Sequence, residues 1–144
     1  MGKISKNDIL YLFEELWPAM RYAESHKVNC LDKIIPIQNY FTKYGSVEHD
    51  KLLSGLCSLD GIGIPIGTGL IWSAHRTLRV PFDKYTLTHS INKKLIRTNN
   101  VLNNYVIFSK QIKEHCDSNK FTIEDFVREA AEELDGSEFL MSPK

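Results

Sequence analysis

Residues 56–70, LCSLDGIGIPIGTGL, decide the fold of this chain. Apolar residues on both sides of the glycine-rich centre recur at helical spacing, which predicts two helices joined by a tight turn. Gly61 and Gly63 are expected to adopt the left-handed backbone of that turn, with Ile62 filling the seam between the helices. Gly67 is expected to let the two helices approach closely.

This stretch resembles the helix-hairpin-helix motif in its leucines, its glycine–hydrophobic–glycine turn and the small and aliphatic residues that follow. In such a motif the outward amides of the turn bind a phosphate, because the dipole at the start of a helix favours an anion. Thr68 is expected to add a hydroxyl donor. Pro65 has no amide to offer, however, and Asp60 brings a carboxylate to the same place. A purely structural pair of helices is therefore the alternative.

The rest of the chain also has helical periodicity, and no segment alternates as a strand does. We expect an all-α domain, a compact bundle of about seven helices. The expected helices cover approximately residues 5–20 with a break at Pro18, 31–44 with a disturbance at Pro36, 47–59, 65–78, 84–95, 102–116 and 123–134. The expected divisions are residues 1–45, 46–80 for the hairpin and 81–136 within one domain over 1–136, followed by a disordered tail at 137–144.

Several polar residues stand where helix caps are expected. Ser5 with Asp8, and Thr122 with Asp125, have the spacing of a capping box. Ser46 is expected to cap the helix that precedes the turn, and Asp83 the helix over residues 84–95.

The composition excludes several classes of protein. With 42% hydrophobic and 25% charged residues, the chain has an ordinary globular composition, and no apolar run approaches the roughly 18 residues of a membrane span. The first residues do not have the pattern of a secretory signal, so we expect a cytoplasmic protein. The three cysteines and five histidines lack the spacings of zinc sites, and no nucleotide-binding glycine loop is present. We expect no disulfide, no metal and no cofactor.

Charge is segregated along the chain, although the total is zero. Residues 1–60 carry −1, residues 61–113 carry +7 and residues 114–144 carry −6. The middle segment is expected to contact a nucleic-acid backbone if its side chains share one face. Its basic residues include Arg76, Arg79, Lys84, Lys93, Lys94 and Arg97. Alternatively, the acidic C-terminal helix lies across this segment and neutralises it.

The order of these features is similar to that in the HhH-GPD superfamily of DNA glycosylases, over about residues 47–96. In that family the hairpin leads through one helix to an apolar residue and an aspartate, which here are Phe82 and Asp83. The resemblance implies a DNA-repair fold in which Asp83 assists the breaking of a glycosidic bond. This chain departs from the pattern, with Pro65 where strand-cleaving members have a lysine and Tyr85 where a histidine is usual. It would be a short, divergent member.

Three functions therefore remain open. The first is a binding module for DNA or another nucleic acid that keeps the fold without the chemistry, with backbone contacts from Gly61, Ile62, Gly63, Thr68, Arg76, Arg79 and Lys84. The second is a monofunctional glycosylase that uses Asp83, which is otherwise a plain helix cap. The third is a helical scaffold protein whose hairpin is structural.

Overall fold

The computed structural model describes residues 3–17 and 24–134, and these residues form helices and no strand. The all-α prediction is confirmed for this part of the chain. The expected break at Pro18 and the expected tail at 137–144 lie outside the described residues. In the described part of the chain, no helix has the length and apolar character that a bilayer span requires.

Eight α-helices follow one another along the described chain, one more than the periodicity predicts. They are α1 (Lys6–Tyr11), α2 (Glu24–Asp32), α3 (Ile34–Lys43), α4 (His49–Cys57), α5 (Ile64–Ala74), α6 (Lys84–Asn92), α7 (Tyr105–Ser118) and α8 (Ile123–Leu134). A π-helical turn, η1 (Leu12–Leu16), continues α1, and a 3₁₀ turn, η2 (Ser46–Glu48), precedes α4.

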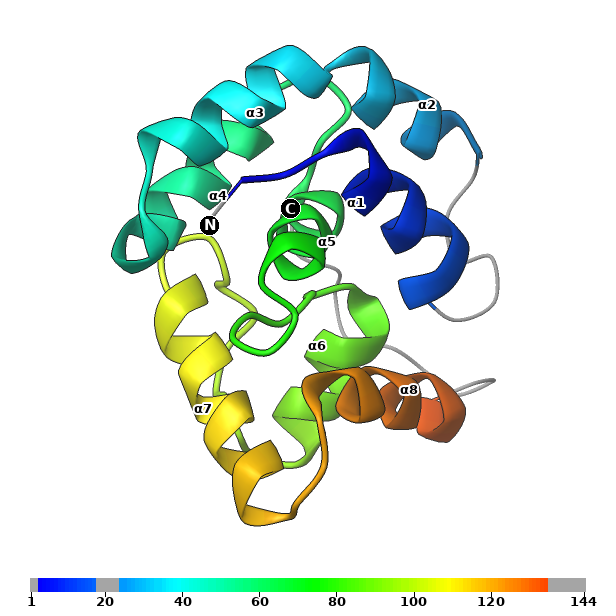
Figure 1. The fold of residues 1–144 in the computed structure, drawn as a ribbon. Coiled ribbons are helices and arrows are strands. Elements are labelled where there is room, and N and C mark those ends of the chain that lie inside the picture. Colours follow the sequence, from blue (N-terminus) through cyan, green and yellow to red (C-terminus); the bar gives the residue numbers. More distant parts are fainter. Residues whose placement is uncertain (1–2, 18–23, 135–144) are drawn as a thin grey trace.

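Helix α5 is the centre of the fold. It lies inside a ring formed by the other helices (Figure 1), and it packs against α1, η1 and α4. Its residues from Ile66 to Ser73 are all buried, which explains why its sequence is apolar on every side. A Cβ added at Gly67 would lie 3.0 Å from Leu53 Cδ1 and 3.3 Å from Cys57 Sγ, so the expected close approach of α4 and α5 is confirmed.

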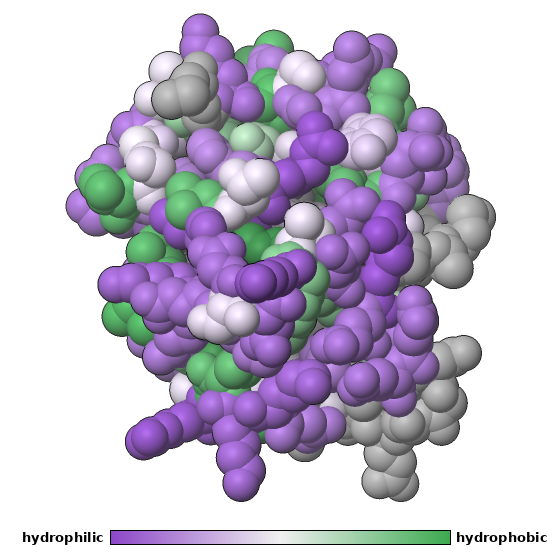
Figure 2. Space-filling view, turned by 60° about the horizontal axis from the view of Figure 1, so that its bottom comes forward, coloured by the Kyte–Doolittle hydropathy of each residue, from purple (hydrophilic) through white to green (hydrophobic). Residues whose placement is uncertain are grey.

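Helices α6, α7 and α8 form the opposite end of the molecule from α2 and α3 (Figure 1). Helix α8 packs along α6, its most extensive partner, and also contacts α7. The face that this end presents is largely hydrophilic, with small separated hydrophobic patches (Figure 2).

The helix caps follow the predictions at three places out of four. Ser5 with Asp8 and Thr122 with Asp125 form reciprocal capping bonds, and Asp83 caps α6. The prediction for Ser46 is wrong, because it begins η2 and its side chain caps no helix.

Two further predictions about the helices are wrong, one on the end of α5 and one on Pro36. Helix α5 ends at Ala74 rather than near Leu78, since the chain turns at His75. Pro36 lies within the first turn of α3, where its missing amide has no helical partner, so it does not disturb the helix.

Candidate functional site

The turn between α4 and α5 is formed, but its two outer glycines differ. Gly61 has a φ of +78°, the left-handed conformation that was expected. Gly63 has φ −97° and ψ −171°, an extended conformation, and it is the N-cap residue of α5. The prediction of a left-handed Gly63 is therefore wrong. Ile62 is 3% exposed and fills the seam as expected.

Exposed backbone at this turn belongs to Gly61 and Gly63. Gly63 has no side chain with which to cap α5. Ile64 and Ile66, in the first turn of α5, are only 1% and 4% exposed, so their amides are covered. The Ile62 amide donates to the Leu59 carbonyl over 3.1 Å. An anion at the turn would therefore meet the amides of the two glycines.

A lysine that the sequence analysis did not single out lies beside this turn. The Asn29 side-chain amide on α2 donates to the Asp60 carbonyl over 3.0 Å, and Lys33 Nζ donates to Asn29 Oδ1. Lys33 is half-buried at the junction of α2 and α3. It adds a positive charge next to Gly61, although nearly thirty residues separate the two in the sequence.

Two side chains expected to contact a nucleic acid, those of Arg79 and Thr68, are instead buried. Arg79 is 5% exposed, donates from Nε to His49 Nδ1 over 2.8 Å and donates from Nη2 to the Ser46 carbonyl over 2.9 Å. Thr68 is fully buried, where its hydroxyl donates to the Ile64 carbonyl and accepts from the Phe82 amide, both over 2.8 Å. The expectation that these side chains face outward is wrong.

The exposed basic residues of the middle segment lie away from the turn. Helix α5 has 11 residues, so its two ends are about 16 Å apart. The turn precedes its first residue, and Arg76 follows its last. Arg76 lies over the Tyr11 ring at 4.8 Å, and Lys84 lies over the Tyr85 ring at 5.5 Å. Sequence segregation of charge therefore does not produce one basic face around the hairpin.

Helix α8, in the acidic segment, packs on α6, in the basic segment. This contact agrees with the alternative interpretation of the charge pattern. His89 on α6 is 2% exposed, and its Nε2 lies 2.8 Å from Glu129 Oε2. Its Nδ1 lies 3.3 Å from Glu133 Oε2, so two residues of α8 bind one ring. These three side chains are close enough to hold a metal ion. The carboxylates nevertheless lie on different ring nitrogens, whereas a metal binds one of them, so the arrangement is best described as a polar tie between the side chains of α6 and α8.

Asp83 has the geometry of a helix cap. It is 1% exposed, and its Oδ1 accepts from the Thr86 amide over 2.8 Å. The cap was the plain alternative to a catalytic role. A catalytic role for Asp83 stays a prediction, and it requires that a flipped nucleotide reach a buried carboxylate.

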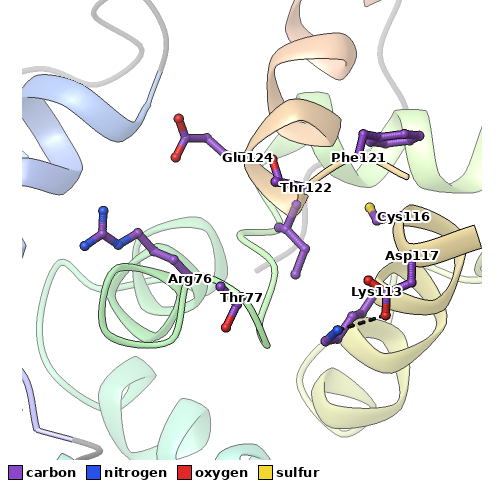
Figure 3. Close-up of a pocket in the computed structure, with 9 residues that line it drawn as sticks. Arg76, Thr77, Lys113, Cys116, Asp117, Phe121, Thr122 and Glu124 are labelled. Atoms are coloured by element: carbon purple, nitrogen blue, oxygen red, sulfur yellow. Dashed lines mark hydrogen bonds and ion pairs between the residues drawn. The ribbon is translucent and has the colours of Figure 1, made fainter. Parts of the chain in front are cut away.

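A cavity of about 520 Å³ opens between the α5–α6 connection, α7 and the start of α8 (Figure 3). Its lining residues include two cations, Arg76 and Lys113, and two anions, Asp117 and Glu124. Lys113 pairs with Asp117 over 2.9 Å. Burial raises the pKa of the Cys116 thiol to about 11, so this cysteine is no nucleophile at neutral pH. Because cations and anions both line the cavity, its charges favour neither a cationic nor an anionic ligand.

Comparison with known proteins gives no relative: no family model, no curated protein and no solved structure matches the chain. The geometry of its own residues is therefore the basis for assigning a function.

Proposed function

We propose that this chain binds a nucleic-acid backbone without reading its sequence, through the turn at Gly61–Gly63. The observation that carries the proposal is the exposed glycine backbone at the start of α5, with Lys33 beside it. Amide donors at a helix start favour a phosphate oxygen, and an ammonium group adds charge attraction. We also propose that α4, the turn and α5 act as a helix-hairpin-helix motif, in which the turn binds the phosphate.

The same geometry limits the strength of binding. Two backbone amides and one lysine suit one or two phosphates, and contacts of this kind to the backbone carry no sequence information. The exposed Asp60 carboxylate, directly before Gly61, weakens the attraction for a phosphate. We expect a dissociation constant of roughly 10⁻⁴ to 10⁻⁶ M at physiological salt, with little preference for sequence. The slope of log affinity against log salt should be about −1 to −2.

Strand cleavage is not part of the proposed function. Pro65 lies in the first turn of α5, at the position where the strand-cleaving glycosylases that this chain resembles have a lysine. An imine cannot form on a proline side chain, so borohydride should trap no covalent adduct there. Base release without strand cleavage, by a monofunctional glycosylase that uses Asp83, does not need that lysine. This activity stays a hypothesis to be tested.

Two lysine variants with the same change of charge test the location of the binding site. Lys33→Glu should weaken binding of a fluorescent DNA duplex by about tenfold, because it reverses the charge beside the turn. Lys93→Glu is the matched control, since Lys93 is exposed beyond the end of α6. It should change the affinity by less than about twofold at moderate salt. An equal or larger loss in Lys93→Glu would move the site to the basic segment and contradict the proposal.

A further inference from the structure

A second cavity, of about 510 Å³, lies where the end of α3, the start of α4 and the end of α5 meet. Phe41, Ala74 and Leu78 give it apolar walls, while His49, His75 and Lys3 give it polar groups. None of its lining residues is an aspartate or a glutamate. The cavity thus combines apolar walls with groups that donate hydrogen bonds or carry positive charge.

Arg79, a buried cation, is hydrogen-bonded to residues that line this cavity. Its hydrogen bonds go to neutral acceptors, namely His49 Nδ1 and the carbonyl oxygens of Ser46 and Leu78. It forms no ion pair with any residue of 3–17 or 24–134. Burial lowers the pKa of the Arg79 guanidinium, and Asp50 opposes this only in part. The Asp50 Oδ1 accepts from the Val106 amide over 2.9 Å. A buried charge without a counter-ion is costly, so the Arg79 charge favours an anion in the cavity that His49 lines.

His49 connects the buried charge with the cavity. Because Arg79 Nε donates to His49 Nδ1, the ring proton of the neutral imidazole must be on Nε2. Burial and the nearby Arg79 lower the pKa of His49 to about 3, so the ring stays neutral above mildly acid pH. His49 is therefore a fixed hydrogen-bond donor that Arg79 polarises.

His75 adds a second unsatisfied group. Its ring packs on His49 with 4.6 Å between the ring centroids. Its Nε2 is buried and has no hydrogen-bond partner. Buried polar atoms without a partner are uncommon in folded proteins, so the wall of the cavity contains a polar group whose hydrogen-bonding capacity is unused.

We propose that this cavity binds a small organic anion with an apolar body, such as an aromatic carboxylate. The negative group lies toward His49, where Arg79 supplies the balancing charge, and Lys3 closes the rim. The apolar body packs on Phe41 and Leu78. This site is separate from the turn at Gly61–Gly63, since His49 is the first residue of α4 and the turn follows the last residue of α4.

Benzoate and benzamide test the proposal, because they have the same shape and differ in charge. Each is titrated into ¹⁵N-labelled full-length protein while amide shifts are followed. Benzoate should saturate at a single site, with shifts confined to residues 41–49 and 74–79. Its affinity should exceed that of benzamide by about tenfold or more. Equal affinities, shifts elsewhere, or no benzoate binding up to about 10 mM would overturn the proposal.

Variants separate the role of Arg79 from effects on folding. Lys3→Gln changes an exposed side chain and should weaken benzoate several-fold while leaving benzamide unchanged. Arg79→Met should abolish the preference for benzoate, and its amide spectrum shows whether the fold is kept. Arg76→Met is the matched control, since Arg76 is exposed and lines the other cavity. If the preference for benzoate over benzamide is unchanged in Lys3→Gln and is also retained in a folded Arg79→Met, the assignment is contradicted.

Discussion

Gly61 and Gly63 look equivalent in the sequence, but a side chain would have different effects at the two positions. At Gly61 a Cβ would lie 2.6 Å from Asn29 Nδ2, and the backbone is left-handed. Gly61→Ala should therefore lower the free energy of unfolding by about 1–2 kcal/mol. Gly63→Asn should change it by only a few tenths of a kcal/mol, since Gly63 is an extended N-cap position with Pro65 Cδ 3.9 Å from the added atom. Urea denaturation measures both, and equal losses would contradict this description of the turn.

At Asp83 the structure supports a capping role, which sets the expected effects of substitution. Asp83→Ala removes the acceptor of the Thr86 amide and should cost about 1–2 kcal/mol of stability. Asp83→Asn keeps the shape and an acceptor oxygen, so stability and nucleic-acid affinity should change little. Thermal denaturation and a binding titration measure these effects. Release of a damaged base by the wild type that is lost in Asp83→Asn would show a catalytic role.

The residue-level predictions failed where burial decides the outcome. Arg79 and Thr68 have donors suited to a phosphate, but those donors are used inside the protein by His49, Ser46 and Ile64. Spacing along the sequence gives no information about such long-range partners. Lys33 was missed for the same reason, because only the Asn29 contact with Asp60 brings it to the turn.

The capping box of α8 predicts a pH dependence. Hydrogen bonds from the Thr122 backbone and side chain lower the pKa of Asp125 below its ordinary value of 3.8. A lowered folded-state pKa contributes stability that is complete above that ordinary value and is lost as pH falls through the lower, folded-state value. Asp125→Asn should therefore reduce the acid sensitivity of α8, as measured by hydrogen exchange between about pH 6 and pH 2. Unchanged acid sensitivity in the variant would contradict the role of this cap.

Helix α8 should also depend on its tie to α6. Replacing Glu129 and Glu133 together with glutamine weakens both contacts with His89, and both carboxylates are partly exposed. We expect a loss of about 1 kcal/mol in the free energy of unfolding. Glu132→Gln is the control, since that exposed residue of α8 belongs to no ion pair in the described chain. A similar loss in the control would show that the tie contributes nothing.

At the scale of the helices, the sequence predicts most of the elements but fewer of their ends. Helices α4 to α8 appear close to where periodicity places them, because each has apolar residues at helical spacing that must be buried. Helix α2 was not predicted as a separate element, since Cys30 is its only buried residue and its apolar stripe is weak. The end of α5 was misplaced because the Arg79 contacts that organise residues after Ala74 are tertiary.

For the whole molecule, the arrangement of charge limits nucleic-acid binding. The +7 segment and the −6 segment meet where α8 packs on α6, and the chain is neutral overall. Binding should therefore depend on a local site rather than on a broad basic face. This predicts similar affinities for duplexes of different sequence and a shallow salt dependence, measurable by fluorescence anisotropy at several salt concentrations. A slope near −4 or steeper would indicate a wider basic surface than the one described.

The central claim, that the turn at Gly61–Gly63 binds a phosphate, is tested most directly by titrating DNA into Gly63→Asp and Gly63→Asn. Both side chains suit an extended N-cap position, so both variants should unfold at nearly the wild-type temperature. Only aspartate places a negative charge where the phosphate binds. We predict that Gly63→Asp weakens binding by about tenfold or more while Gly63→Asn binds like the wild type. Wild-type affinity in a stably folded Gly63→Asp would contradict the claim.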